Sequence, residues 1–144
     1  IVAPKDYSTL EEIRERLYEE SLGESRSKGT DASRKAYLNN MRAQAELIYD
    51  EVGGYGTESF FLGPCSKEEG TLFGEDTFFE LISAATDQNT ERAVCYSGTS
   101  QNTGNIDEYA ISAPLTTDSD YSYCVDSTGF AGEIFGTLSG NSCQ

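Results

Sequence analysis

Apolar residues recur at helical spacing in two stretches of the first third of the chain. The first stretch holds Leu10, Ile13 and Leu17, and the capping-box pattern Ser8-Thr9-Leu10-Glu11 stands at its start. Glycine is common just after a helix C-terminus. We therefore expect this helix to end near Gly23, followed by a polar joint over residues 26–30.

The second stretch predicts a longer helix over about residues 31–52. Its apolar stripe recurs every three or four positions and consists of Leu38, Met41, Ala45, Ile48 and Val52. Charged side chains lie off this stripe, so the helix is amphipathic. We expect the run Gly53-Gly54-Tyr55-Gly56 to end it.

A short helix and several strands follow. Residues 57–74 contain a proline and predict a loop. The capping-box pattern Thr77-Phe78-Phe79-Glu80 predicts a short amphipathic helix that ends near Asn89. Beyond it, a Gly/Ser/Thr/Asn-rich loop is expected over 97–105. Short apolar runs and alternation of apolar and polar side chains predict strands over 93–96, 108–113, 121–125 and 133–138.

Helices precede strands along the chain, and the connections are short. This order is typical of an α+β fold, here a long N-terminal amphipathic helix packed on a small antiparallel sheet. We expect two units. Residues 1–24 form a separate helical segment, and residues 25–144 form a globular head that includes the 31–52 helix.

Charge is spread unevenly along the 144 residues, which carry 25 acidic and 10 basic side chains and a formal net charge of −15. Residues 1–42 sum to zero, whereas residues 43–144 hold only Lys67 and Arg92 against 17 carboxylates. A head this acidic repels phosphate groups, so we expect it to bind no nucleic acid. No apolar run has the length of a membrane span or of a signal peptide.

The composition disfavours catalysis. The chain contains no His, which excludes Ser-His-Asp and Cys-His centres and His-ligated metals. No glycine-rich phosphate loop is present, and no base stands near Ser127 or Ser139. We therefore expect a binding or structural protein, not an enzyme, that needs no cofactor.

The four cysteines all stand in the second half of the chain, at Cys65, Cys95, Cys124 and Cys143. None belongs to a CxxC pair, so a zinc site made of all four is the less favoured alternative. An even number among strand-like segments predicts two disulfides and an oxidising location outside the cytoplasm. Three pairings are open on these grounds.

Two further sets of residues are candidates for contact or metal binding. Aromatic residues in loop-like regions predict an exposed contact patch made of Tyr55, Phe60, Phe61 and Phe73. Three carboxylates near the 121–125 strand are calcium candidates, namely Asp118, Asp120 and Asp126. Their spacing fits no EF-hand loop, and a solvated acidic loop is the alternative interpretation.

Two segments, in the same order as in the family, resemble bacterial type IV pilins and the related pseudopilins. The first is the run from Arg26 to Lys35, continued by Ala45-Glu46-Leu47-Ile48-Tyr49-Asp50 and the glycines after it, which resembles the exposed half of the family's first helix. The second is Tyr123-Cys124-Val125-Asp126-Ser127-Thr128-Gly129, with Cys143 closing the chain. The resemblance covers about residues 26–144.

The resemblance implies a structural subunit of a cell-surface filament (a fimbrium), whose acidic head faces solvent and whose partners are other pilin subunits. It leaves open whether the filament serves twitching, adhesion, secretion or DNA uptake, and whether the head meets a surface or host ligand. Major pseudopilins also bind calcium in their C-terminal loops, which bears on Asp118, Asp120 and Asp126. The alternative function is an extracellular adhesin or ligand-binding module of unrelated fold.

The front of the chain departs from the family pattern. A pilin begins with a very hydrophobic half-helix that sits in the membrane, whereas residues 1–24 are polar and charged. We expect that a soluble segment stands in place of the membrane half, and that the isolated head is monomeric. The resemblance also favours Cys124–Cys143 as a bridge around the C-terminal loop, which leaves Cys65–Cys95. The second choice is Cys65–Cys143 with Cys95–Cys124.

Overall fold

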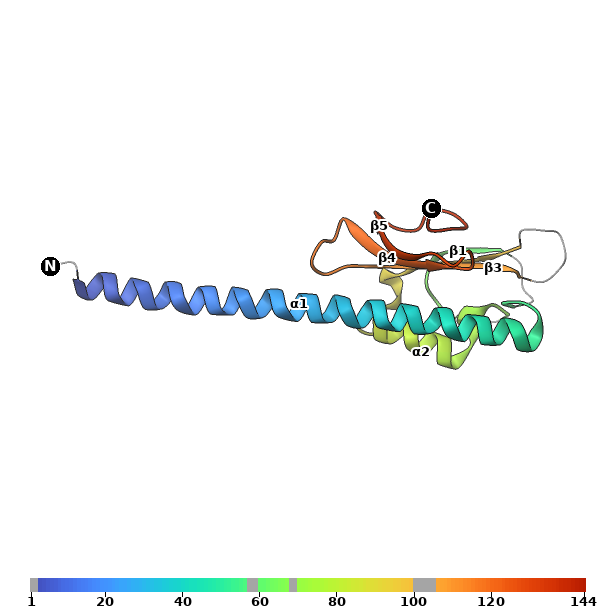
Figure 1. Ribbon diagram of the computed structural model, residues 1–144, viewed down its shortest axis with the longest axis horizontal. Helices are drawn as coiled ribbons and strands as arrows, with labels where there is room; N and C mark the ends of the chain where they lie inside the picture. The colour runs from blue at the N-terminus through green and yellow to red at the C-terminus, as the bar shows by residue number, and fades with distance from the viewer. Residues whose placement is uncertain (1–2, 57–59, 68–69, 100–105) are drawn as a thin grey trace.

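A single long helix runs along one side of the molecule and projects well beyond the rest of it (Figure 1). The computed structural model describes residues 3–56, 60–67, 70–99 and 106–144, with helix side chains from residue 12 onward except those of 20 and 24. The helix, α1, spans Ala3–Val52 and has 50 residues. At 1.5 Å per residue it is roughly 75 Å long.

The helix is continuous, so the expected end near Gly23 and the expected joint over 26–30 are wrong. Glycine inside a helix costs only about 1 kcal/mol relative to alanine, which the helix-favouring neighbours of Gly23 and Gly29 offset. The C-terminal end of α1, just before the glycine run that begins at Gly53, is as predicted. Gly53 takes a left-handed conformation (φ 79°), and its N–H donates to the carbonyl of Tyr49 at 2.7 Å. That residues 1–24 form a unit separate from the head stays a prediction.

The strands form one antiparallel sheet in which chain neighbours are also spatial neighbours, in the order β1-β2-β3-β4-β5. The strands are β1 (Phe61–Pro64), β2 (Val94–Gly98), β3 (Glu108–Pro114), β4 (Tyr121–Asp126) and β5 (Ala131–Phe135). The α+β fold with an antiparallel sheet is therefore confirmed. β1 lies where we expected only loop, and β5 begins before the expected 133. The expected 97–105 loop lies partly outside the described residues.

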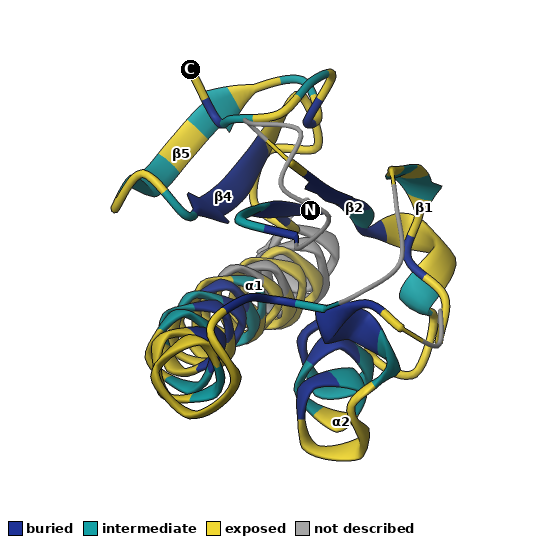
Figure 2. Cartoon of the chain, turned by 90° about the vertical axis from the view of Figure 1, so that its right-hand side faces the viewer, coloured by how far each residue is buried: buried dark blue, intermediate teal, exposed yellow. Residues whose placement is uncertain are grey.

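The face of the sheet toward α1 carries the main core. Alternate residues of β3 and β4, such as Ile111 and Val125, which lie opposite each other, point to this side. They meet the buried stripe of α1, where Leu38, Met41 and Ala45 are fully buried. A second helix, α2 (Asp76–Ala85), lies beside α1 and adds Phe78 and Ile82 to the core (Figure 2).

The short helix differs in detail from its prediction. It begins at Asp76 after Glu75, whose side chain makes no capping hydrogen bond, so the expected cap at Thr77 is wrong. It ends at Ala85, not near Asn89, because Asp87 and Gln88 take positive φ values of 53° and 69°.

The outer face of the sheet is covered by the last nine residues, 136–144, which we call the C-terminal strap. Its Leu138 packs with Tyr96, Ala110 and Cys124 in a second, smaller apolar cluster. The Leu138 N–H donates to the Ser112 hydroxyl at 3.0 Å. The layers are therefore helices, sheet and strap.

Two disulfides join these parts, and both expected pairs are confirmed. Cys65–Cys95 links the residue after β1 to β2, and Cys124–Cys143 fastens the strap to β4. The second-choice pairing and the zinc alternative are wrong. Bridges that span 30 and 19 residues each contribute about 3 to 4 kcal/mol in the chain-entropy account. They place the head in an oxidising compartment.

Candidate functional site

The junction of α1 with the β3–β4 loop is fixed by one buried carboxylate. Asp31 Oδ1 accepts from the Thr116 N–H and hydroxyl, both at 2.7 Å. Its Oδ2 accepts from the Thr117 N–H at 3.0 Å and hydroxyl at 2.6 Å. Burial raises the pKa of Asp31, but these hydrogen bonds outweigh burial and lower the pKa to about 2. Asp31 therefore holds α1 in register with the loop as a carboxylate.

One turn further along α1, Arg34 is buried with only 3% of its surface exposed. Its Nη1 donates to the carbonyl of Pro114 at 2.5 Å. The nearest carboxylate oxygen is Oδ2 of Asp87, 3.6 Å from Nη2, which is an ion-pair distance but too long for a hydrogen bond. Nε and Nη2 of Arg34 are buried and have no hydrogen-bond partner among the described residues.

The same helix is linked to β4 and β5 by polar contacts. Lys35 Nζ lies 2.8 Å from Oε1 of Glu133 and 5.8 Å from the centre of the Tyr123 ring. The hydrogen bond to Glu133 raises the pKa of Lys35. The Tyr123 hydroxyl donates to Oδ1 of Asn39 at 3.2 Å. Basic residues of α1 thus meet backbone and acidic groups of the sheet along most of the contact.

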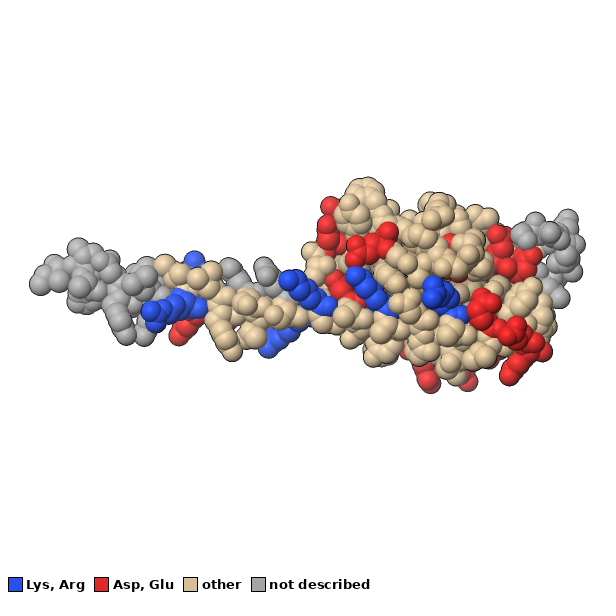
Figure 3. Space-filling view, in the orientation of Figure 1, with Lys and Arg blue, Asp and Glu red and all other residues tan. Residues whose placement is uncertain are grey.

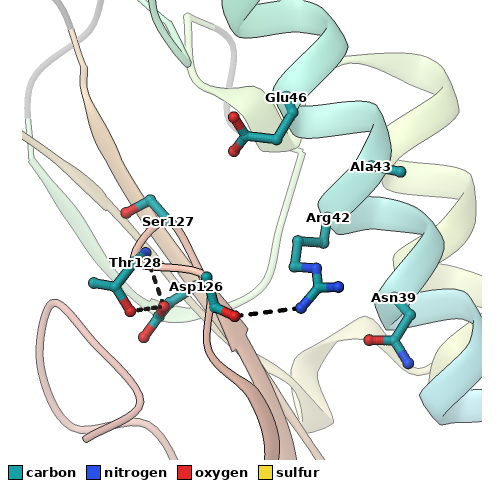
Figure 4. Close-up of a pocket in the computed structure, with 8 residues that line it drawn as sticks. Asn39, Arg42, Ala43, Glu46, Asp126, Ser127 and Thr128 are labelled. Atoms are coloured by element: carbon teal, nitrogen blue, oxygen red, sulfur yellow. Dashed lines mark hydrogen bonds between the residues drawn. The ribbon is translucent and has the colours of Figure 1, made fainter.

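A cleft of about 390 Å³ lies where α1 faces the turn between β4 and β5. Figure 4 shows Asn39, Arg42, Ala43 and Glu46 on the helix side and Asp126, Ser127 and Thr128 on the turn side. Arg42 donates to the carbonyl of Gly129 at 3.3 Å, and Glu46 accepts from the Tyr55 hydroxyl at 2.8 Å. Burial, followed by this hydrogen bond, raises the pKa of Tyr55. The cleft offers hydrogen-bond donors and acceptors for recognition. Its Arg42 and Glu46 side chains already have hydrogen-bond partners within the head.

The three calcium candidates do not come together. Asp126 is buried, and its Oδ1 accepts from the N–H and hydroxyl of Thr128 and from the Phe130 N–H. Its Oδ2 accepts from the Cys143 N–H at 2.8 Å. Asp118 and Asp120 are exposed beyond the other end of β4. Within the described ranges, no group of three or more acidic or cysteine side chains is placed to hold a metal ion.

Asp126 has a role that sequence reasoning missed. Four donors converge on one carboxylate, and they come from the β4–β5 turn and from the end of the strap. Asp126 therefore anchors the strap beside the Cys124–Cys143 bridge. An Asp followed two residues later by Thr and three residues later by Gly is a turn signal that could have indicated this role.

The expected exposed aromatic patch is wrong for two of its four residues. Tyr55 is only 4% exposed and Phe73 is buried, because their loops fold back onto the core. The Tyr55 ring lies 4.8 Å from that of Tyr109, and the Phe73 ring lies 5.8 Å from that of Phe78. Of the other two, Phe61 is half-buried and Phe60 is 67% exposed.

A different aromatic pair is exposed. Tyr121 and Phe135 lie opposite each other on β4 and β5, with ring centres 5.5 Å apart and nearly perpendicular. Phe135 is 76% exposed. By the alternation of strand side chains, the pair lies on the helix side of the sheet, next to the pair Tyr123 and Glu133. Its position at a strand end between turn residues is the signal that could have found it.

Charge is separated along the length of the molecule. Figure 3 shows Lys and Arg side chains following α1 and Asp and Glu gathered mostly on the head. The last turns of α1 carry exposed Glu46, Asp50 and Glu51 and no basic residue in the final turn. Within α1, described side chains 12–19 and 21–23 are all exposed. None of the helices, as far as they are described, has a stretch apolar and long enough to span a membrane.

Comparisons with family models, with curated proteins and with solved structures found no match for this chain. The function must therefore be inferred from the geometry of the structure. This geometry consists of a long helix, half packed and half projecting, an antiparallel sheet, two disulfides and polar surfaces suited to binding. This architecture is pilin-like.

Proposed function

We propose that the chain is the head of a structural subunit of a type IV pilin-like filament, located at the outer surface of a cell. The observation that carries the proposal is the division of α1. Its C-terminal half is packed into the head through Leu38, Met41 and Ala45, while the described side chains from 12 to 19 are all exposed on the part that projects beyond the head (Figure 1). A subunit that assembles through a helix needs such a projecting segment and a head that folds without it.

The fastening of α1 to the head supports the same function. At the edge where the helix leaves the sheet, Asp31 binds the β3–β4 loop and Arg34 binds the last residue of β3, and Arg42 binds the β4–β5 turn further along. A pull on the projecting helix would be transmitted to the sheet through these contacts. The two disulfides support an extracellular location, because structural disulfides persist under oxidising conditions.

In this function the projecting helix would pack against the helices of other subunits, and the acidic head would face solvent. The head would act by shape and surface chemistry, with no catalysis and no cofactor. The charge of −15 on residues 43–144 would keep single heads apart in solution and disfavour nucleic acid.

Filament assembly tests the proposal directly. Residues 3–24 are replaced by an apolar helix of equal length, and the chimera is produced in bacteria that carry a type IV assembly system but no major pilin. Electron microscopy with an antibody against residues 106–144 should show labelled filaments. The unchanged chain, with its polar segment, is the matched control and should form none. A chimera that is folded, disulfide-bonded and membrane-inserted but never labels a filament would overturn the proposal.

The adhesin alternative makes a different prediction. A binding module of unrelated type would attach to cells or glycans as a single head with high affinity and would gain nothing from assembly. Tight binding by the unchanged chain, together with failure of the chimera to assemble, would favour that alternative.

A further inference from the structure

A buried, incompletely paired arginine lies beside a small polar cavity on the side of α1 that faces α2. The cavity has a volume of about 250 Å³. Arg34 and Asp87 line it from two sides, together with Ser33 and Tyr37. Nη1 of Arg34 is bound to the Pro114 carbonyl, whereas Nη2, on the opposite edge of the guanidinium together with Nε, lies 3.6 Å from Oδ2 of Asp87.

That opposite edge has an unmet requirement. Nε–H and Nη2–H point in parallel and form the fork that grips both oxygens of a carboxylate. In the part of the chain that the structure describes, neither nitrogen has a hydrogen-bond partner, although both are buried. A buried cation with unsatisfied donors costs several kcal/mol, so an acceptor at this fork would be strongly favoured.

Asp87 only partly supplies that acceptor. Its Oδ2 stays 3.6 Å from Nη2, and its side chain is 75% exposed. Asp87 and Gln88 both hold positive φ values. Two consecutive non-glycine residues in this region cost about 1 to 2 kcal/mol each. The turn after α2 therefore holds Asp87 near the fork under strain, and little packing keeps its carboxylate from swinging outward.

We propose that this cavity binds a small hydroxylated carboxylate of the uronic-acid type, with its carboxylate on the Arg34 fork in the place that Asp87 now approaches. The fork selects a carboxylate with two oxygens. Ser33 and Tyr37 are both exposed residues that line the cavity. They bring hydroxyl groups and an aromatic ring, which suit the hydroxyl groups and the carbon face of a sugar ring. In addition, the cavity is smaller than the roughly 300–1,000 Å³ of sites for drug-sized ligands, which fits one sugar residue.

Charge favours a monoanion over a phosphate. The chain carries a net charge of −15, and Asp87 stays close to the bound group even after it moves. A carboxylate brings one negative charge and matches the single guanidinium, whereas a phosphate dianion would leave one charge uncompensated. Released from the fork, the Asp87 carboxylate can accept a hydrogen bond from a hydroxyl group of the ligand. The proposal concerns binding by the single head and does not depend on filament assembly.

The test is a titration of the full chain with sodium glucuronate at low ionic strength, followed by two-dimensional NMR of backbone amides. Glucose and acetate serve as probes that each lack one half of the ligand chemistry. We expect saturable shifts at residues 33–37 and 84–88 with glucuronate and at least about tenfold weaker binding of either probe, the effect of one lost charge-assisted contact or its equivalent. Glucose binding as tightly as glucuronate, or absence of saturable shifts at these residues, would overturn the proposal.

Three variants assign the residues. Asp87→Asn removes the competing charge from an exposed position and should tighten glucuronate binding several-fold, whereas Asp118→Asn, an equally exposed change elsewhere, should leave it unchanged. Arg34→Lys keeps the charge but not the fork and should weaken binding by about tenfold or more. If Arg34→Lys fails to fold, Asp87→Asn still tests the proposal. Unchanged or weaker binding of glucuronate by Asp87→Asn would overturn the idea that the ligand takes the place of the Asp87 carboxylate at Arg34. Tyr37→Ala should weaken glucuronate binding but not acetate binding.

Discussion

Replacing Asp31 by Asn tests the account of how α1 is held to the head. The carboxylate accepts two hydrogen bonds at each oxygen, from the N–H and hydroxyl groups of Thr116 and Thr117. In Asp31→Asn the amide oxygen can still accept the hydrogen bonds from the N–H and hydroxyl of Thr116. The amide NH₂ faces the Thr117 N–H, so two donors meet and that N–H loses its acceptor. The change preserves size and isolates the effect of charge and acceptors.

The magnitude follows from the pKa. Although burial raises the pKa of Asp31, the hydrogen bonds from Thr116 and Thr117 lower this pKa from its ordinary value of 3.8 to about 2, a difference that corresponds to about 2.5 kcal/mol of stability. Since the folded pKa is depressed, this stability is fully present above pH 3.8. It is lost as the pH falls from 3.8 toward 2, where the native carboxylate becomes protonated. We therefore expect Asp31→Asn to lower the free energy of unfolding by about 2 to 3 kcal/mol at pH 7.

The assay is urea unfolding followed by circular dichroism, with both disulfides intact, at several pH values from 7 to 2. The difference between the native chain and Asp31→Asn should shrink below pH 4 and approach zero near pH 2. Asp50→Asn, an exposed change on the same helix, is the matched control and should alter stability by less than about 0.5 kcal/mol. A loss in Asp31→Asn that stays constant with pH, or that does not exceed the control, would refute the reasoning.

Three further changes probe the helix and the strap. Gly29→Ala places a methyl group in open space on α1 and should raise stability by up to about 1 kcal/mol in thermal unfolding; a lower melting temperature would contradict a continuous helix there. Glu51→Lys removes an acid from the C-terminal end of α1 and should stabilise by about 0.3 to 1 kcal/mol, with a gain that added salt reduces. The double change Cys124→Ser and Cys143→Ser should cost about 3 kcal/mol and increase hydrogen exchange at residues 136–144, whereas unchanged exchange would show that the noncovalent contacts hold the strap without the bridge.

Local patterns predicted the elements that packing also favours. The stripe from Leu38 to Val52 predicted a helix, and its buried face is right for Leu38, Met41 and Ala45 and in part for Ile48. Val52 is 68% exposed, so the stripe is wrong at its last position. The alternation in residues 121–125 predicted β4. The cysteine pairs were confirmed because each joins segments that the antiparallel order brings close together. In these places the preference of the local sequence and the requirement of the fold agree.

The errors arise where distant contacts outweigh local signals. Gly23 is a helix-ending signal only if the following residues prefer another conformation, and here they continue the helix. β1 contains Gly63 and Pro64, which disfavour strands, yet an edge strand tolerates proline because one side of its backbone needs no ladder. Tyr55 follows a glycine pair and suggests an exposed loop, but its N–H bonds to the Ile106 carbonyl and its ring is buried.

Most of the candidate sites could not be predicted, since they depend on which residues the fold brings together. Arg34 is one of eight basic residues in the first 42, and its sequence neighbours do not show that it is buried against Pro114. Likewise, Asp126 is one of three nearby carboxylates, and only the return of the strap gives it the Cys143 N–H. In both cases a charged group becomes important because a segment about 20 to 80 residues away supplies its partner.

The division of α1 explains how one head is compatible with very different N-terminal segments. From Asp31 onward, buried side chains and polar contacts to the sheet and its connecting loops determine where the helix lies. These polar contacts are made by Asp31, Arg34, Lys35, Asn39 and Arg42. Residues 12–19 are exposed, so their substitution alters helix propensity and solubility but no described contact of the core. A polar segment such as this one and an apolar segment that enters a filament or a membrane would therefore extend from the same folded head. If the chain assembles as proposed, selection for assembly would act on the first half of the helix while selection for stability acts on the second.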